Sequence, residues 1–164
     1  MNKRTICLVL TLVCALTMLA QHYNIVKNIA YTMKTDTYSA QRLKLDIYYQ
    51  EQATDLPVVV WFHGGGLTSG EKDFPYKLKE KNCVLVAVNY RLLPNVTIDQ
   101  TIVDVAEAVA WVMNYITEYG GRTKKMIVSG HSAGGYLTMM LALNKQWLDR
   151  YGKDANQIAA YVPF

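Results

Sequence analysis

A serine between two glycines is the residue whose surroundings most clearly indicate chemistry. Residues 130–134 read Gly-His-Ser-Ala-Gly and fit G-x-S-x-G, a sharp strand-to-helix turn that exposes the serine hydroxyl as a nucleophile. Gly130 and Gly134 leave room for that turn, and free N–H groups at the start of the following helix favour negative charge nearby. An ordinary glycine turn at the end of a strand is the alternative. The pattern predicts Ser132 as the nucleophile of an acyl-transfer reaction.

A second glycine-rich segment, His63-Gly64-Gly65-Gly66, follows an apolar run that ends at Phe62. Glycines let the backbone turn its N–H groups toward a substrate oxygen, as an oxyanion hole requires. A flexible loop and a phosphate-binding loop are the alternatives, but the Lys and Ser/Thr of the P-loop pattern are absent here. We expect His63 to hydrogen-bond the loop and hold its shape rather than to act as a base.

Strand patterns surround both glycine-rich segments. Continuous apolar runs are typical of strands buried on both faces of a parallel sheet, and alternation of apolar and polar residues indicates extended structure. The predicted strands are an extended segment at 38–49, buried strands at 58–62, 84–89 and 125–129, and a further buried strand at 158–162.

Helix patterns lie between these strands. Thr97 and Gln100 have the spacing of a capping box, an apolar stripe continues to Ile116, and Gly120-Gly121 ends the helix. A short helix is predicted at 74–81, and a helix that is apolar on nearly all sides, and therefore buried, at 133–143. Strands that alternate with helices predict an α/β fold with a mostly parallel sheet.

Three ordered motifs resemble a known family: HGGG at 63–66, Tyr90-Arg91-Leu92-Leu93-Pro94, and Gly130-His131-Ser132-Ala133-Gly134-Gly135. From about residue 30 onward the chain is similar to the α/β-hydrolase esterases of the hormone-sensitive-lipase-like group and to related secreted carboxylesterases. The resemblance implies an α/β-hydrolase fold, with a mostly parallel sheet and helices on both faces. It also implies a serine carboxylesterase for short-acyl or carbohydrate-linked esters, a small-molecule substrate handled without a cofactor.

The resemblance also assigns roles to single residues. It implies Ser132 as nucleophile and the backbone N–H groups of Gly65, Gly66 and Ala133 as oxyanion donors. Four further residues match positions that support the fold rather than the chemistry: Tyr90, Arg91, Asp104 and Trp111.

The other members of a catalytic triad are missing. In this fold the triad runs Ser, then Asp or Glu, then His. After Ser132 the sequence has Asp149 and Asp154, which precede the last predicted strand, and no histidine; the three histidines are His22, His63 and His131. An eight-stranded hydrolase needs well over roughly 200 residues. We therefore expect residues 21–164 to be the N-terminal part of a single α/β-hydrolase domain, without its C-terminal strands and helices and inactive alone.

Two other functions remain open at this point. A catalytically dead hydrolase-like domain could bind a ligand or partner, although such a domain has no need of both loops. A serine peptidase on the same fold is also possible, because serine chemistry does not choose between ester and amide.

The first twenty residues have the pattern of a secretory signal peptide. Lys3 and Arg4 form a basic head, and residues 6–20 are almost entirely apolar. We expect cleavage and a secreted or periplasmic protein; a retained membrane anchor and a lipoprotein are the alternatives. The run is short for a span of about 20 residues.

Composition excludes several other classes of protein. With 51% hydrophobic and 18% charged residues, the chain is not disordered. The net charge of +4 comes partly from the predicted signal, and the remaining lysines are dispersed, which argues against nucleic-acid binding. Beyond the signal only Cys83 remains, predicted buried, and no histidine pair has metal-ligand spacing. Of the twelve tyrosines, we interpret four as strand or helix surface rather than sugar-stacking platforms: Tyr48, Tyr49, Tyr115 and Tyr119.

Overall fold

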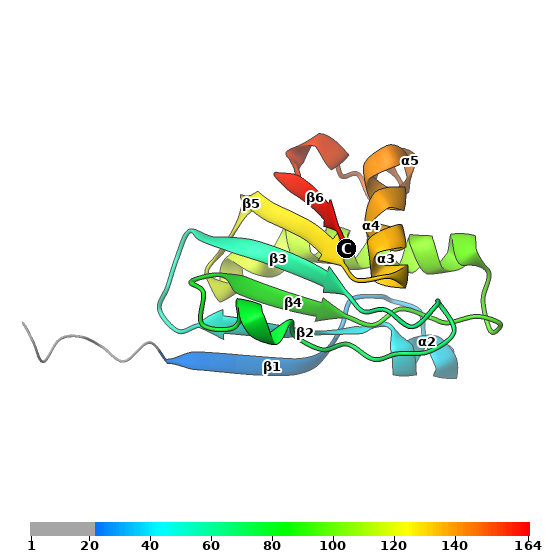
Figure 1. Ribbon diagram of the computed structural model, residues 1–164, viewed down its shortest axis with the longest axis horizontal. Coiled ribbons are helices and arrows are strands. Elements are labelled where there is room, and N and C mark those ends of the chain that lie inside the picture. Colours follow the sequence, from blue (N-terminus) through cyan, green and yellow to red (C-terminus); the bar gives the residue numbers. More distant parts are fainter. Residues whose placement is uncertain (1–21) are drawn as a thin grey trace, which may run out of the picture.

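A six-stranded sheet in the order β1-β2-β4-β3-β5-β6 forms the frame of the molecule (Figure 1). The computed structural model describes residues 22–164, so the predicted signal peptide lies outside the described residues. The strands are β1 (Tyr23–Ala30), β2 (Lys44–Gln50), β3 (Leu56–Phe62), β4 (Val84–Val88), β5 (Gly121–Gly130) and β6 (Ala160–Pro163). Four of them, β4, β3, β5 and β6, run parallel, whereas β2 is antiparallel to both of its neighbours.

Helices connect the parallel strands, as strand–helix alternation predicts. The α-helices are α2 (Thr37–Arg42), α3 (Ile98–Tyr115), α4 (Ala133–Leu143) and α5 (Gln146–Asp149). Short 3-10 helices complete the chain at η1 (Tyr76–Leu78), η2 (Ile116–Tyr119) and η3 (Ala155–Gln157). Among residues 22–164, no helix is both long and apolar enough to cross a membrane.

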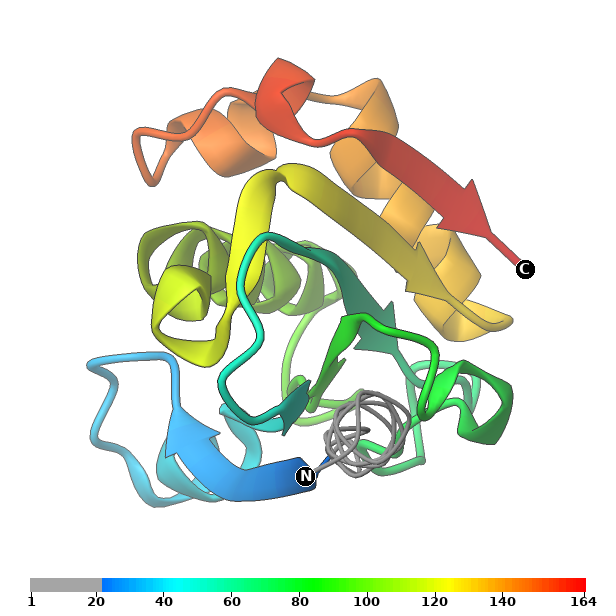
Figure 2. The ribbon, with the colours of Figure 1, turned by 90° about the vertical axis from the view of Figure 1, so that its left-hand side faces the viewer.

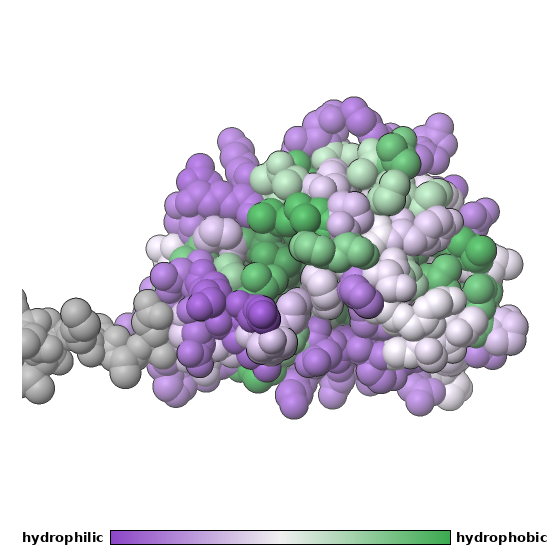
Figure 3. All heavy atoms as spheres, in the orientation of Figure 1, coloured by the Kyte–Doolittle hydropathy of each residue, from purple (hydrophilic) through white to green (hydrophobic). Residues whose placement is uncertain are grey.

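The two faces of the sheet are covered differently. On one face, valines of β3 and β4 such as Val60 and Val86 share a large buried core with α3 and α4. On the opposite face a smaller cluster around Val59 and Leu85 is covered within residues 22–164 by η1 rather than by an α-helix (Figures 1 and 2). The same face carries a gathering of apolar side chains over β3 and β5 (Figure 3). One face is therefore fully packed and the other only partly.

The helix α3 follows its sequence signals closely. Thr97 and Gln100 form the predicted capping box, with the Gln100 N–H donating to Thr97 Oγ1 at 3.3 Å and the Thr97 N–H donating to Gln100 Oε1 at 2.8 Å. After η2 the chain reverses at Gly120, whose φ of +77° and contact with Ala53 leave no room for a side chain.

Several predicted elements are wrong or misplaced. The first half of the 38–49 segment is α2, because the Asp36 carboxylate caps it by accepting from the Ser39 N–H at 2.9 Å. The helix predicted at 74–81 shrinks to η1, since Glu80 and Asn82 adopt left-handed backbone angles that end any helix. The strand predicted at 125–129 is β5, which starts earlier, at Gly121. The sequence did not predict β1.

Burial also departs from expectation at both ends of the sheet. The predicted buried strand at 158–162 is β6, which is half-exposed because it pairs only with β5 within the described residues. On α4, Leu137 and Leu141 are buried but Met139 and Leu143 are exposed, so that helix is not buried on all sides. Tyr48, predicted at the surface, is 7% exposed and stacks on Tyr23. Cys83 is buried and free, as predicted.

Candidate active site

The two glycine-rich segments meet at one edge of the sheet. Phe62 at the end of β3 pairs with Gly130 at the end of β5, so the loops that follow these parallel strands start side by side. From β3 the chain continues to β4 on one side, and from β5 it continues to β6 on the other. A crevice outside the carboxyl ends of parallel strands, where the strand order reverses, is where ligands bind in open α/β sheets.

The turn after β5 holds Ser132 in an unusual backbone conformation. Ser132 has φ +53° and ψ −114°, in the left-handed half of backbone space, where a residue other than glycine is strained. Its N–H donates to the Phe164 carbonyl at 2.7 Å, and its own carbonyl accepts from the Tyr136 N–H at 2.9 Å, which begins α4. The Ser132 side chain does not cap α4 and stands exposed at the helix start, where a nucleophile must be.

Glycine is required on both sides of Ser132 for steric reasons. A Cβ atom on Gly130 would lie 2.5 Å from the Gly134 carbonyl carbon. A Cβ atom on Gly134 would lie 2.1 Å from the Phe62 carbonyl oxygen. Since both distances are far inside van der Waals contact, the turn packs directly against the end of β3, as the G-x-S-x-G pattern predicts.

The loop after β3 is a tight turn with its N–H groups uncommitted. Gly65 and Gly66 have φ values of +114° and +62°, and the Gly65 carbonyl accepts from the N–H groups of Thr68 and Ser69 at 3.1 and 3.0 Å. Within residues 22–164, no backbone acceptor pairs with the N–H of Gly65, Gly66 or Ala133. These are the three groups predicted as oxyanion donors.

The loop and the serine turn touch through Gly64. A Cβ atom on Gly64 would lie 3.4 Å from Ser132 Cβ and 3.1 Å from His131 Nδ1. Beside this contact is a cavity of about 280 Å³, lined by Trp61, His63, Gly64, Asp73, Phe74, Pro75, Tyr76 and His131. The structure therefore brings together the predicted nucleophile, the predicted oxyanion loop and a small cavity with several aromatic walls.

His63 and Tyr90 support the loop from below. Their rings stack with centroids 4.3 Å apart and planes 11° apart, and the Tyr90 hydroxyl donates to the His63 carbonyl at 2.7 Å. Burial lowers the pKa of His63, so the ring is held neutral. Its Nδ1 lies 2.6 Å from the Gly64 carbonyl oxygen. His63 thus hydrogen-bonds the loop, as the sequence predicts, and its position suits a support rather than a base.

A buried polar network under the same loop was not predicted from the sequence. Arg42, at the end of α2, donates from Nε to the Tyr90 carbonyl and from Nη2 to the Gly70 carbonyl, both at 3.1 Å, and pairs with Glu71. Asn89 donates to the Glu71 carboxylate at 2.5 Å. The sequence shows only an arginine directly before the apolar Leu43. That Arg42 is buried, together with Ser39 and Leu43, is known from the structure alone.

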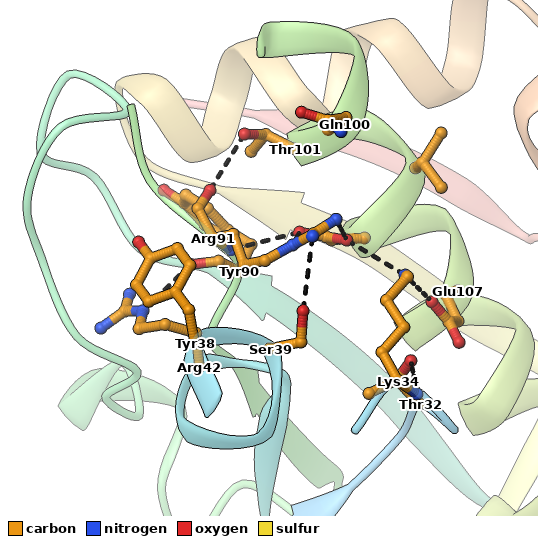
Figure 4. Close-up of polar contacts among 12 residues, drawn as sticks. Thr32, Lys34, Tyr38, Ser39, Arg42, Tyr90, Arg91, Gln100, Thr101 and Glu107 are labelled. Carbon is orange, nitrogen blue, oxygen red and sulfur yellow. Dashed lines mark hydrogen bonds and ion pairs between the residues drawn. The ribbon is translucent and has the colours of Figure 1, made fainter. Parts of the chain in front are cut away.

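Arg91 and Asp104 form a second ion pair, in which the Asp104 side chain is fully buried. Figure 4 shows Arg91 with its hydrogen-bond partners Ser39 and Thr101. Arg91 donates from Nε and Nη2 to the two Asp104 oxygens at 2.8 and 2.7 Å, and these hydrogen bonds to the carboxylate raise the pKa of Arg91. Lys34 approaches the same carboxylate at 3.4 Å. This pair ties the segment after β4 to α3, as expected of fold-supporting residues; Trp111 is half-buried against the core.

No described histidine or acid completes a triad with Ser132. His22 lies at the start of β1 and is 3.1 Å from Glu51. Asp154 caps η3, and Asp149 is exposed on α5. His131 occupies the turn itself. Among residues 22–164, no hydrogen bond reaches Ser132 Oγ, and no group of three His, Cys, Asp or Glu side chains could hold a metal ion.

Comparisons with known proteins point to one family. The model of the family described as BD-FAE matches residues 45–161. The probable carboxylic ester hydrolase LipM of Mycobacterium tuberculosis is 34% identical over 116 residues, which cover 66% of this chain and 27% of that protein. Secreted lipase 5 of Gibberella zeae is 35% identical over 99 residues, covering 49% and 18%.

The fold has solved counterparts. The crystal structure of esterase B from Lactobacillus rhamnosis superposes with a TM-score of 0.68 at 19% identity, covering 92% of this chain and 52% of that one. This likeness shows the α/β-hydrolase fold. The chain spans about a quarter or less of the length of the two curated relatives named above and about half of the esterase B chain.

Proposed function

The chain belongs to the BD-FAE family of α/β-hydrolase esterases and lipases, and on that premise we propose that it carries the nucleophile half of a carboxylic ester hydrolase. Ser132 is the nucleophile, and the N–H groups of Gly65, Gly66 and Ala133 form the oxyanion hole. The observation that carries the proposal is the close packing of the strained Ser132 turn on the glycine loop, where a Cβ atom added to Gly64 would lie 3.4 Å from Ser132 Cβ.

The reaction is a two-step acyl transfer. Ser132 Oγ attacks the ester carbonyl carbon while its proton passes to a histidine base, and the carbonyl oxygen becomes an oxyanion held by the three N–H groups. The tetrahedral intermediate expels the alcohol, which takes the proton from the base. Water then loses a proton to the base and attacks the acyl carbonyl carbon; the bond to Ser132 Oγ breaks, the base returns the proton to Oγ, and the acid is released.

The proposal assigns the histidine base and its carboxylate to residues of the full-length protein beyond Phe164. Without them, the oxyanion hole alone leaves only residual catalysis, so residues 22–164 by themselves are inactive in practice. Short-acyl or carbohydrate-linked esters are the proposed substrates on the resemblance to the family, and the cavity of about 280 Å³ beside Gly64 and His131 suits a short acyl group. Residues 1–20 are proposed as a cleaved signal peptide that takes the enzyme out of the cytoplasm.

Labelling with a fluorophosphonate tests the nucleophile directly. Full-length protein should be labelled at Ser132 and hydrolyse p-nitrophenyl acetate, and Ser132→Ala should abolish both. Replacement of an exposed hydroxyl outside the site, Thr35→Ala, should change neither. Failure of the unaltered full-length protein to react would favour a catalytically dead binding domain, and preferred cleavage of a peptide p-nitroanilide would favour a peptidase.

A further inference from the structure

A second hollow lies on the helical side of the sheet, away from Ser132. It has a volume of about 300 Å³ and opens between α3 and the loop that follows β1, which lie on the same side of the sheet in Figure 2. The residues that matter here are Met33, Glu107, Trp111, Asn114, Tyr115 and Tyr151. None of them lines the cavity beside the serine turn, and none has a role in the proposed esterase mechanism.

One wall of the hollow is aromatic and partly open to solvent. Trp111 and Tyr115 stand one turn apart on α3, with ring centroids 4.9 Å apart and planes tilted by 40°. Tyr115 is 43% exposed, and Met33 on the opposite rim is 93% exposed. Large apolar side chains left open around a hollow are typical of a surface that receives a ligand.

The polar groups of the hollow favour a neutral ligand. Lys34 Nζ lies 2.6 Å from Glu107 Oε2, so the carboxylate already has its counterion while other lone pairs can still accept. The Tyr151 hydroxyl lies 3.5 Å from the same oxygen. Burial, together with the nearby Glu107, raises the pKa of Tyr151, which keeps that hydroxyl protonated.

Asn114 adds hydrogen-bond donors at the rim. Its Oδ1 accepts from Lys153 Nζ, which leaves the amide N–H groups for a ligand. A purely apolar ligand would cover the remaining lone pairs of Glu107 and the amide N–H groups of Asn114 without giving them partners, which costs free energy. A cation would be repelled by Lys34, whose charge already neutralises Glu107, and an anion would be repelled by the carboxylate itself.

We propose that this hollow binds neutral sugar units of an oligosaccharide, which replaces the interpretation of Tyr115 from the sequence as plain helix surface. A pyranose ring has an apolar C–H face, which stacks on Trp111 and Tyr115, and a rim of hydroxyls, which hydrogen-bond the Glu107 carboxylate and the Asn114 amide. An apolar, cationic or anionic ligand would not match both the aromatic wall and the polar groups of the hollow. The site would hold the carbohydrate part of a large ligand independently of Ser132.

Titration of the full-length protein with neutral hexasaccharides tests the site. Xylohexaose, cellohexaose and mannohexaose are titrated separately by isothermal calorimetry, with tryptophan fluorescence as a second signal. At least one should bind saturably, and both Trp111→Ala and the exposed-site variant Tyr115→Ala should weaken it at least tenfold, which corresponds to about 1.4 kcal/mol. Asn114→Ala should weaken it less. Ile98→Ala, at an exposed apolar residue of α3 that lines neither cavity, is the matched control and should bind normally.

Three results would overturn the proposal. The first is that none of the three sugars binds. The second is that binding survives unchanged in Tyr115→Ala, whose exposed position makes misfolding an inadequate explanation. The third is a preference for the positively charged chitosan hexamer that Glu107→Gln removes, which would make the hollow a cation site. Because the readout is binding and not hydrolysis, none of these results depends on Ser132.

Discussion

The loop after β3 and the turn after β5 lie against each other, yet they are held in place by different means. Side chains hold the loop: Tyr90 stacks under His63 and donates to its carbonyl, and Arg42 donates to the Tyr90 and Gly70 carbonyls. Backbone packing holds the serine turn, where Gly134 leaves no space for even one additional carbon atom. The loop should therefore respond to loss of polar partners, and the turn to added volume.

The largest effect should come from adding one methyl group to the serine turn. In Gly134→Ala the new Cβ would lie 2.1 Å from the Phe62 carbonyl oxygen, and backbone atoms on that side cannot yield. We expect a loss of more than about 4 kcal/mol in the free energy of unfolding, or no folded protein. Urea denaturation followed by circular dichroism measures it.

The control for this substitution lies in the loop. In Gly66→Ala the new Cβ atom would have one neighbour within 4 Å, Thr68 Oγ1 at 3.8 Å. The free energy of unfolding should therefore fall by only about 1 kcal/mol, because of the φ of +62° alone. If Gly66→Ala proves as harmful as Gly134→Ala, the contrast between the two segments is wrong.

Removal of the buried guanidinium should have the next largest effect. Arg42→Met leaves the buried Tyr90 carbonyl and the partly buried Gly70 carbonyl without their charged donor, and we expect a loss of about 3 kcal/mol in the free energy of unfolding. Arg122→Met is the matched control, because the Arg122–Asp55 pair is exposed on both sides and should cost under about 1 kcal/mol. Equal losses in the two variants, measured by thermal denaturation, would show that the network under the loop contributes no more than a surface ion pair.

A single hydroxyl under the loop should have a smaller effect. Tyr90→Phe keeps the ring that stacks on His63 but removes the 2.7 Å hydrogen bond to the His63 carbonyl. We expect a loss of about 1 to 2 kcal/mol in the free energy of unfolding. Tyr76→Phe, at an exposed tyrosine, should leave the melting temperature unchanged, and a Tyr90→Phe protein with an unchanged melting temperature would contradict the role of this bond.

The contrast between the two segments also explains what the sequence could predict. The serine turn, the capping box at Thr97 and the apolar strand cores depend on residues close together along the chain, so their patterns can be read directly. Arg42 donates to the carbonyl of Tyr90, 48 positions away, and no residue near Arg42 in the sequence indicates that hydrogen bond. The error at 38–49 has a different cause: two local signals competed there, and the Asp36 cap on Ser39 outweighed the alternation of apolar and polar residues. Local geometry was predicted, whereas Arg42 and its contacts under the loop were not.

The pH dependence of stability should report the burial of His63. Its pKa is lowered in the folded protein because burial disfavours the charged ring. The unfolded chain takes up the proton near its usual value of about 6.5, so this contribution to stability is complete above that pH. It should be lost as the pH falls from there through the lower folded pKa. Melting temperatures measured between neutral and mildly acidic pH should fall less steeply in His63→Gln than in the unaltered protein; parallel curves would contradict the prediction.

The smallest effect should have the opposite sign. Ser132 has a φ of +53°, which strains the backbone of any residue with a Cβ atom but not that of glycine. Ser132→Gly should therefore raise the free energy of unfolding by about 1 kcal/mol, whereas Ser132→Ala, which keeps the strain, should leave it nearly unchanged. Both should lose fluorophosphonate labelling in the full-length protein. If Ser132→Gly is no more stable than Ser132→Ala, the turn is not strained; if it is, stability is being given up at the one residue that must face the substrate.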